Sequence, residues 1–398
     1  MVTAGNSVIP LPGTLYAHED RAHNSSMVRV AIIGLGAATR NIHVPAYARL
    51  GSRVSIVAGC DVSEDARNMG LKCGIPTVFD DPREMIQKTA PDIVSVCTPP
   101  ASHFEHTLLA LHEGCHVFCE KPLTDSLDNA DLLIREAERV GRQIVVNCQF
   151  PYMEIHLSAK KLIGSPEFGR LLFLQAWQTF QPTVTTESGW RGELKRRVGF
   201  EFGIHVFELI RFFFDDTPVS VAAQMPEILP AGASDLINIV TTQFADGRAA
   251  SMVLNRISKG RERYLDMRLD GENASIRTSI GGRLEIKAGL HTRTRRPFLG
   301  VDVVAGGKAT LENGTRTRVI AKDGMNPFAS ATARHFENFI DELWRGVPPR
   351  GSAADHKKTL ALVFAAYDAA QSGRTVNVNR YLSTELHASF GRTESRNL

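Results

Sequence analysis

The chain has 398 residues, of which 43% are hydrophobic and 22% are charged. This length suffices for two hydrophobic cores, and the composition is ordinary for a soluble globular protein. With 46 basic and 43 acidic residues the formal charge is +3, and no uninterrupted apolar segment reaches the roughly 20 residues of a membrane span, so we expect neither a nucleic-acid nor a membrane partner.

Residues 1–26 lack the basic start and long apolar core of a signal peptide, so we expect an arm before the first strand. Residues 27–150 alternate short apolar runs with helix-like segments such as 102–113 and 127–140. Buried strands that alternate with helices indicate a parallel sheet covered on both faces. The expected strands are Val28–Ile33, Val54–Cys60, Ile93–Cys97, Cys115–Cys119 and Ile144–Phe150.

The pattern changes in residues 151–380, which we predict to be a second domain, followed by a poorly ordered tail over 381–398. Consecutive strand candidates joined by turns such as Ala245-Asp246-Gly247 indicate an antiparallel sheet. The expected strands are Leu171–Phe180, Val219–Gln224, Ile237–Phe244, Ala249–Ile257 and Tyr264–Asp270. Helices are expected over 155–163, 199–214, 326–344 and 353–372.

Residues 281–322 are rich in basic, glycine and threonine residues and include the run from His291 to Arg296. We interpret this segment as a solvated excursion or a subunit contact, with a site for an anionic ligand as the alternative.

The six cysteines show no disulfide-framework spacing, and several lie in apolar runs, which favours a reducing cytoplasm. Cys115, His116 and Cys119 lie close together, but no second pair completes a tetrahedral set. We therefore expect no metal site.

A glycine-rich turn follows the first expected strand and opens a helix, which is the context of a dinucleotide site. Gly34 permits the tight turn, and Gly36 lets the backbone approach a pyrophosphate at the helix N-terminus. Thr39 replaces the usual third glycine, so the fingerprint is incomplete, and such turns also occur without a cofactor. The candidate cofactor-binding residues here are Gly34, Gly36, Ala37, Ala38 and Thr39.

Asp61 ends the second expected strand, at the distance where an acidic residue binds the ribose hydroxyls. An aspartate there repels a 2′-phosphate, so NAD is favoured, while Arg67 one turn later leaves NADP open. Asp61 or Ser63 could equally be a helix N-cap.

A loop of Thr98, Pro99 and Pro100 follows the fourth expected strand, where a bound cofactor should pass. Ser102 could cap the next helix, and His103 is a candidate for the cofactor loop or for capping and packing. The next strand leads to Glu120-Lys121-Pro122. A lysine at the carboxyl end of a strand in a doubly wound sheet is placed to touch a reacting substrate.

In their order and spacing these motifs resemble the glucose–fructose oxidoreductase and inositol dehydrogenase family (Gfo/Idh/MocA), over roughly residues 28–376. The residues that carry the resemblance are Gly34-Leu35-Gly36, His43, Cys60-Asp61, Thr98-Pro99-Pro100, His103 and Glu120-Lys121-Pro122.

The resemblance implies an α/β protein: an N-terminal Rossmann domain with a doubly wound parallel sheet, and a C-terminal α+β domain with a large open, mostly antiparallel sheet. In the family this sheet often forms subunit contacts, so a homo-oligomer (dimer or tetramer) is expected. The Glu-Lys-Pro lysine touches both substrate and nicotinamide ribose, a role that transfers to Lys121. Cofactor contacts are implied for Glu120 and for Gln149, which stands where the family often has arginine.

The family's second signature places an acid, a glycine and a histidine on a helix that faces the nicotinamide, here Glu201, Gly203 and His205. Glu201 and His205 are four residues apart and share a helix face, which suits an acid/base pair or an ordinary surface pair. Glu201 replaces the usual aspartate, and the basic run 195–199 replaces a glycine run. That basic run could contact an acidic group of a substrate.

Trp190-Arg191 resembles a pair in the active-site loops of some members, where an aromatic ring and a guanidinium bind a sugar, although a structural tryptophan is an equal alternative. The substrate-binding residues expected are Lys121, Tyr152, Trp190, Arg191, Glu201 and His205.

The resulting hypothesis is an NAD(P)-dependent oxidoreductase acting on a secondary hydroxyl or ketone of a sugar, glycoside or cyclitol. His205 would exchange the proton, Lys121 would polarise the oxygen and Glu201 would orient the groups. One alternative is a catalytically silent sugar sensor of the same fold. Another is an enzyme that holds its cofactor tightly and uses transient oxidation for elimination or epimerisation.

Overall fold

The structure is a computed structural model that describes residues 27–180, 189–194, 196–228, 235–259, 264–281, 283–290, 297–304, 306–314 and 316–382, with backbone only for 283–290 and 297–304. The expected arm over 1–26, most of the tail and the basic run 291–296 lie outside these residues. The expected domain organisation therefore stays a prediction at both ends of the chain.

The N-terminal sheet has six parallel strands in the order β3-β2-β1-β4-β5-β6, which confirms the expected doubly wound sheet. Successive residues of β1 face opposite cores: Val30 and Ile32 lie in one, Ala31 and Ile33 in the other. Both faces are thus covered. The strands are β1 Val28–Ile33, β2 Val54–Cys60, β3 Val78–Phe79, β4 Ile93–Val96, β5 His116–Glu120 and β6 Ile144–Asn147.

Three of the helices between these strands begin at side-chain caps, because oxygens of Ser63, Asp81 and Ser126 accept backbone N–H groups of the first turn. Ser63, and not Asp61, is therefore the N-cap of the helix that begins at Glu64. The side chain of Ser102 makes no such hydrogen bond within the described residues, so it does not cap the helix that begins at His103, contrary to the suggestion from sequence. The helices are α1 Val44–Arg49, α2 Glu64–Lys72, α3 Pro82–Thr89, α4 His103–His112 and α5 Leu127–Val140, with short turns at Thr39–His43, Gly51–Arg53 and Pro100–Ser102.

The C-terminal sheet has nine strands in the order β16-β15-β12-β11-β7-β10-β9-β8-β17. All neighbours are antiparallel except β7 and β10, which are parallel. The strands are β7 Leu171–Thr179, β8 Ser220–Gln224, β9 Ile237–Gln243, β10 Ala249–Asn255, β11 Leu265–Gly271, β12 Ser275–Ile280, β15 Gly307–Asn313, β16 Arg316–Asp323 and β17 Val376–Asn377.

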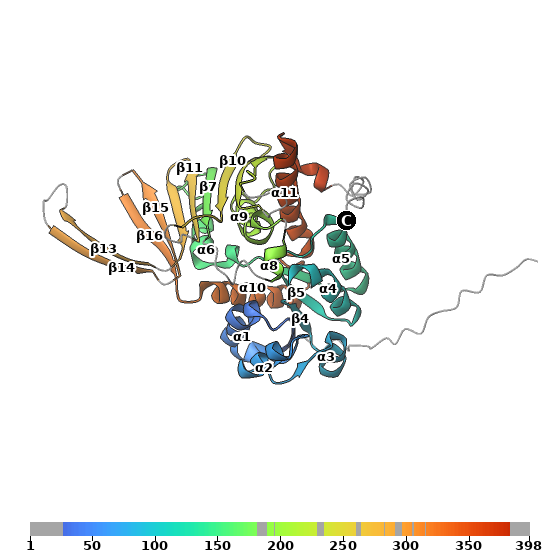
Figure 1. Ribbon diagram of the computed structural model, residues 1–398. Coiled ribbons are helices and arrows are strands. Elements are labelled where there is room, and N and C mark those ends of the chain that lie inside the picture. The colour runs from blue at the N-terminus through green and yellow to red at the C-terminus, as the bar shows by residue number, and fades with distance from the viewer. Residues whose placement is uncertain are drawn as a thin grey trace, which may run out of the picture.

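Helices cover one face of this sheet, and in β9 and β10 every second side chain is buried against them. Figure 1 shows the sheet above the N-terminal half, with α9 and α11 to the right of its strands. The helices are α6 Glu154–Leu162, α8 Trp190–Glu193, α9 Ile204–Phe214, α10 Pro327–Trp344 and α11 Ala353–Ser372, with turns at Phe150–Tyr152, Val198–Phe202 and Val378–Tyr381.

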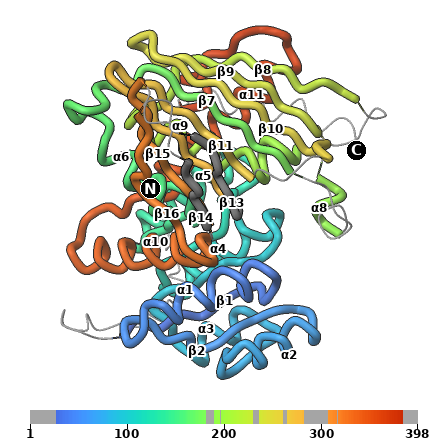
Figure 2. Tube along the Cα trace, turned by 90° about the vertical axis from the view of Figure 1, so that its left-hand side faces the viewer, coloured from blue at the N-terminus to red at the C-terminus, as the bar shows by residue number. Residues whose placement is uncertain are grey.

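Helix α10 packs on the N-terminal sheet although its sequence belongs to the second predicted domain. Its residues Phe336 and Phe339 contact the ring of Phe118 in β5, and Glu337 accepts a hydrogen bond from Arg53 at 2.6 Å. Figure 2 shows α10 between the two sheets. The two halves are therefore joined by a shared core as well as by the chain.

The segment 281–322, interpreted from sequence as an excursion, contains strands throughout its described part. β13 Arg283–Leu290 and β14 Pro297–Val304 pair as a separate two-stranded ribbon, which extends away from the nine-stranded sheet in Figure 1. The following strands β15 and β16 form the edge of that sheet. Within the described residues, no helix has the length and apolar character needed to cross a bilayer.

Candidate active site

A cavity of about 620 Å³ lies at the carboxyl ends of β1, β2, β4 and β5. The sheet order reverses between β1 and β4, and such switch points are where doubly wound sheets bind ligands. Among the predicted site residues, those that line the cavity are Gly34, Gly36, Ala37, Ala38, Asp61, Thr98, Pro99, Pro100, Glu120, Lys121, Trp190, Arg191 and Glu201.

The two glycines of the first turn meet different requirements. Gly34 has φ +92°, and a Cβ there would lie 2.7 Å from the backbone of Cys97 and Thr98. A Cβ on Gly36 would meet nothing within 4 Å, so this side of the turn is open to the cavity. Thr39 takes no part in the wall, because its buried hydroxyl donates to the carbonyl of Gly34 at 2.5 Å. This buried hydrogen bond of Thr39 therefore holds the glycine turn from the side of the protein core.

The carboxylate of Asp61 is held by backbone at the cavity wall. One oxygen accepts the N–H of Leu35 at 2.8 Å and the other accepts the N–H of Ser63 at 2.9 Å. Arg67 donates to the carbonyl of Asp61 at 2.8 Å, so its guanidinium lies beside this residue. The predicted ribose-binding acid is thus pre-oriented, with a cation next to it.

His103 holds two loops of the site together from behind the wall. Its ring nitrogens lie 2.7 Å from the carbonyl of Pro122 and 2.8 Å from the carbonyl of Thr98. Burial lowers the pKa of this imidazole, so the neutral ring donates to one carbonyl at a time. The histidine that lines the cavity is His106, whose Nδ1 lies 3.3 Å from the hydroxyl of Thr98. Sequence reasoning missed it, although its position one turn after His103 was a signal.

Glu120 anchors the end of β5. One of its oxygens lies 2.7 Å from Nε2 of His43 and accepts from Asn147 at 2.8 Å. Burial alone would raise the pKa of Glu120, but the hydrogen bond and charge of His43, together with the charge of Lys121, lower it. The carboxylate therefore stays ionised next to Lys121, and the buried His43–Glu120 pair fixes the loop that carries the lysine.

Lys121 projects from this loop toward the C-terminal half. Its Nζ donates to the carbonyl oxygen of Glu201 at 2.6 Å, and the Lys121–Pro122 peptide bond is cis. An ammonium group has three N–H donors, so the hydrogen bond to Glu201 leaves donors for a ligand in the cavity.

Glu201 lies in a π-helical turn, Val198–Phe202, directly before α9. Its side chain is buried, and one carboxylate oxygen accepts from Nε of Arg191 at 2.6 Å. The other oxygen is buried with no hydrogen-bond partner in the described part of the chain. The guanidinium of Arg191 stacks over the ring of Trp190 at 4.3 Å. A carboxylate, a guanidinium and an indole in mutual contact therefore form part of the cavity wall.

His205 lies one turn after Glu201, at the start of α9, and is not part of the cavity wall. Its ring stacks on Phe150 with 4.0 Å between centroids, and its Nδ1 lies 3.7 Å from Sγ of Cys148. Burial lowers the pKa of His205 well below its usual value, and the positive charge of Lys121 lowers it further. The imidazole is thus neutral and close to Lys121, while its proposed contact with substrate stays a prediction.

The two remaining predicted residues lie away from the cavity. Gln149 is buried, with its carbonyl oxygen unpartnered among the described residues. Tyr152 stacks on His335 at 4.0 Å and lines a second cavity, whose wall includes neither Lys121 nor His205. Their assignment to cofactor and substrate stays a prediction.

Comparisons with known proteins agree with this geometry. The family model described as "Oxidoreductase family, NAD-binding Rossmann fold" matches residues 28–148, and the "GFO/IDH/MocA C-terminal domain" matches residues 156–277. The chain belongs to the Gfo/Idh/MocA family. Its N-terminal half is the NAD-binding Rossmann domain of the family, and the cavity lies at the edge of that domain's sheet.

Several relatives in this family have named activities. A D-apiose dehydrogenase of Paraburkholderia graminis is 27% identical over 87% of this chain and 89% of its own length. A D-glucoside 3-dehydrogenase of Escherichia coli is 40% identical over 30% of this chain and 34% of its own length. An inositol 2-dehydrogenase of Mycolicibacterium smegmatis is 27% identical over 81% of this chain and 86% of its own length.

Solved structures share the whole Gfo/Idh/MocA fold. An oxidoreductase from Agrobacterium radiobacter in complex with NAD+, L-tartaric acid and magnesium has a TM-score of 0.75 and 19% identity, covering 89% of this chain and 99% of that one. An aldose-aldose oxidoreductase from Caulobacter crescentus complexed with glycerol has a TM-score of 0.72 and 20% identity, covering 88% of this chain and 100% of that one. At such identities these likenesses show the fold alone.

Proposed function

We propose that this protein transfers a hydride between NAD and a secondary hydroxyl or ketone of a sugar, glycoside or cyclitol. The observation that carries the proposal is the composition of one cavity wall. The glycine turn and Asp61 line this cavity together with Lys121, Arg191 and Glu201. The dehydrogenases of apiose, glucosides and inositol among the relatives support the substrate class.

The residues fit NAD at the Rossmann end of the cavity. Gly36 leaves space for the pyrophosphate, Asp61 offers its carboxylate to the ribose, and Pro99 and Pro100 form a rigid wall beyond them. The bound nicotinamide supplies the hydride acceptor or donor. Thr39, His103 and Gln149 act on this site through the loops and core that they fix.

The residues at the other end have distinct roles. Lys121 donates hydrogen bonds to the substrate oxygen that gains negative charge during oxidation, and Glu201 holds Arg191 toward the substrate hydroxyls. Trp190 offers an apolar ring face to the sugar. His205, kept neutral by burial, accepts the hydroxyl proton.

The proposal is tested with purified full-length protein, NAD and a panel of pentoses, hexoses, glucosides and cyclitols. Growth of the near-ultraviolet absorbance of reduced nicotinamide with one class of compound is the expected result. If cofactor binds but no compound on the panel is oxidised, and no matching ketone is reduced, the proposal fails. Cofactor that copurifies and exchanges with added NAD would count against an enzyme that retains it through the cycle.

We expect Asp61→Asn to weaken NAD and to relax discrimination against NADP. The substitution keeps an acceptor for the N–H of Leu35 but removes the charge that holds the ribose hydroxyls and repels a 2′-phosphate. Loss of one charged hydrogen bond corresponds to a rise of about tenfold in KM for NAD. KM for NADP should fall. Asp65→Asn, on the exposed start of α2, is the matched control. If Asp61→Asn changes KM for NAD and KM for NADP by the same factor, Asp61 does not discriminate between the two cofactors.

We further propose that the protein forms a homo-oligomer, a dimer or tetramer, through the open face of the nine-stranded sheet. Trp177 and Ile239 lie on this face with exposed fractions of 49% and 41%, and both are in register with Val253 between them. An exposed apolar row across three neighbouring strands is typical of an interaction surface. Figure 2 shows these strands, β7, β10 and β9, side by side at the top of the molecule.

Trp177→Glu is expected to convert this oligomer to monomers, because it places a charge at the most exposed residue of the apolar row. Size-exclusion chromatography with light scattering measures the change. Leu132→Glu on α5, at a residue 46% exposed outside the sheet, should keep the wild-type mass. An unchanged mass for Trp177→Glu would remove this face from the interface.

A reducing cytoplasm is the compartment that we propose. All six cysteines are free thiols and five of them are buried, so the fold uses them as small apolar side chains.

A further inference from the structure

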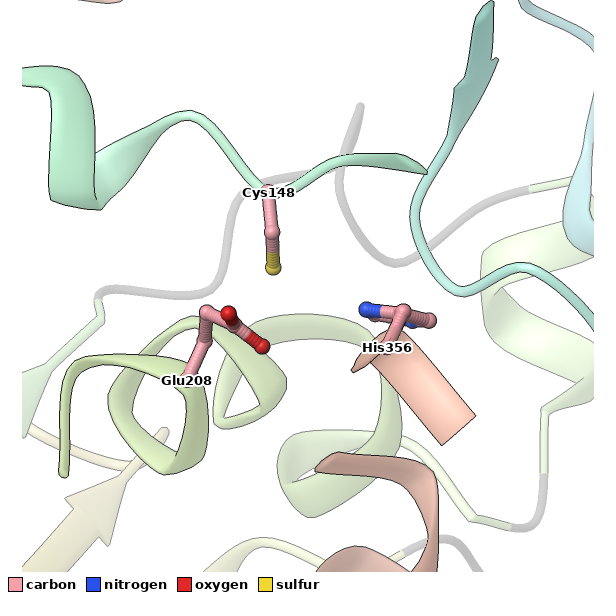
Figure 3. A group of neighbouring side chains, drawn as sticks. All are labelled: Cys148, Glu208 and His356. Carbon is pink, nitrogen blue, oxygen red and sulfur yellow. The ribbon is translucent and has the colours of Figure 1, made fainter. Parts of the chain in front are cut away.

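The second cavity, of about 730 Å³, has an unexplained group of three ligand-type side chains in its wall. Cys148 follows β6, Glu208 lies on α9 and His356 lies on α11. Sγ of Cys148, a carboxylate oxygen of Glu208 and a ring nitrogen of His356 all lie within 4.8 Å of one another. Figure 3 shows the three side chains turned toward a common space from three different segments.

These side chains are not explained as ordinary core. Their exposed fractions are 4%, 9% and 1%, although each carries a polar group that needs a partner when it is buried. Nε2 of His356 accepts a long hydrogen bond from the N–H of Leu123 at 3.5 Å. Nδ1 of the same ring is buried with no hydrogen-bond partner in the described part of the chain. An unsatisfied imidazole nitrogen beside a thiol and a carboxylate is an open ligand position.

We propose that Cys148, Glu208 and His356 bind a divalent transition-metal ion of the zinc type. Thiolate, imidazole and carboxylate are the three side-chain ligands that zinc takes in proteins, whereas magnesium and calcium avoid sulfur. Three protein ligands leave a fourth tetrahedral position, and the cavity that these residues line has room for a water there. Small shifts of the side chains bring the ligand atoms to bonding distance.

The charges of the surroundings are compatible with this ion. A divalent cation bound by one thiolate, one carboxylate and one neutral imidazole sums to zero. A neighbouring cation is Arg211, with Nη1 3.6 Å from a Glu208 oxygen, and its own charge is balanced by Asp355 at 2.6 Å. The hydroxyl of Thr359 donates to the same Glu208 oxygen, as outer-shell groups do for ligating carboxylates. The buried charges therefore balance.

The site is separate from the cofactor cavity but adjoins the proposed proton acceptor, because Sγ of Cys148 lies 3.7 Å from Nδ1 of His205. A metal here would join the end of β6 to α9 and α11 directly behind that histidine. Its first consequence is structural: loss of the ion should loosen the three segments that hold His205 in place. The proposal depends on these contacts alone and stands whether or not the substrate is a sugar.

The experiment uses full-length protein, treated with chelator and then titrated with Co²⁺ alone as a spectroscopic substitute for zinc. One equivalent per chain is expected, with a thiolate-to-cobalt charge-transfer band and the visible bands of a tetrahedral ion. Cys148→Ala and His356→Gln should weaken Co²⁺ binding by more than the roughly 10–100-fold that outer-shell partners contribute, and Cys148→Ala should remove the charge-transfer band. Competition by Zn²⁺ should displace the cobalt.

Matched controls are Cys115→Ala, at a buried cysteine of the N-terminal core, and His335→Gln, at a buried histidine of the same cavity outside the group. Both should keep the wild-type spectrum. If a ligand variant does not fold, X-ray absorption of the zinc-loaded wild type decides, with one sulfur neighbour at about 2.3 Å expected. Absence of stoichiometric binding, absence of a sulfur neighbour, or an unchanged band in Cys148→Ala would each overturn the proposal.

Discussion

Lys121→Met is expected to reduce turnover by about 10²–10³-fold while the protein still binds NAD. Methionine keeps the length and apolar character of the side chain but removes the three N–H donors. Oxidation of a hydroxyl builds negative charge on the substrate oxygen, and loss of one pre-oriented donor to such an oxygen lowers turnover by about 10²–10³-fold. Within the described part of the chain, Lys121 donates one hydrogen bond, to the carbonyl of Glu201, so its loss should affect the bound substrate more than the fold.

Rapid mixing with pre-bound NAD separates the two steps, because nicotinamide absorbance follows hydride transfer and protein fluorescence follows cofactor binding. The matched control is Lys160→Met, at a half-buried lysine of the second cavity paired with Asp215, which should keep the wild-type rate. Near-wild-type turnover in Lys121→Met would remove the lysine from the reaction and leave the cavity as a binding site only.

The N-terminal half was the more predictable part of the fold. Its buried parallel strands are short uninterrupted apolar runs, so Val28–Ile33 and Val54–Cys60 were found at their observed bounds. β3 has only two residues, Val78–Phe79, and such a segment leaves no periodicity to read. Most strands after β11 were also missed, because charged and threonine side chains alternate on an edge and hide the apolar face.

Contacts between segments that are distant in the sequence could not be predicted either. The sequence of α10 predicts an amphipathic helix but contains nothing that says which sheet its apolar face covers, and it covers the N-terminal one. The parallel pairing of β7 with β10 inside an otherwise antiparallel sheet is equally invisible to local pattern.

The candidate site, too, was predictable only where the local sequence pattern carries the information. Gly34, Asp61, Thr98 and Lys121 were predictable because each ends a strand, and the carboxyl ends of parallel strands meet at one edge. Tyr152 lies after that edge, in a turn that reverses the chain, and so faces the second cavity. The Cys148, Glu208 and His356 group comes from three elements whose packing no spacing rule describes.

His205→Asn is expected to lower kcat by about 10²–10⁴-fold, the range that a positioned acid or base contributes, with cofactor affinity unchanged. The ring is held in plane by Phe150 and stays neutral through burial, so it is available as a proton acceptor in the pH range where an exposed histidine would be partly charged. Asparagine keeps a polar group of similar reach at Nδ1 but does not take up a proton. A fall in kcat and kcat/KM together, without a rise in KM for NAD, is the signature of an interaction made in the transition state.

The matched control is His106→Asn, at the histidine that does line the cofactor cavity beside Thr98. There the same substitution should raise KM for NAD and leave kcat close to wild type, because that ring contacts the loop that we propose to bind the cofactor. Opposite signatures for the two histidines would separate proton transfer from cofactor binding. If His205→Asn changes thermal stability but not kcat, the imidazole is a packing partner of Phe150, and the proton leaves by way of Lys121 or water.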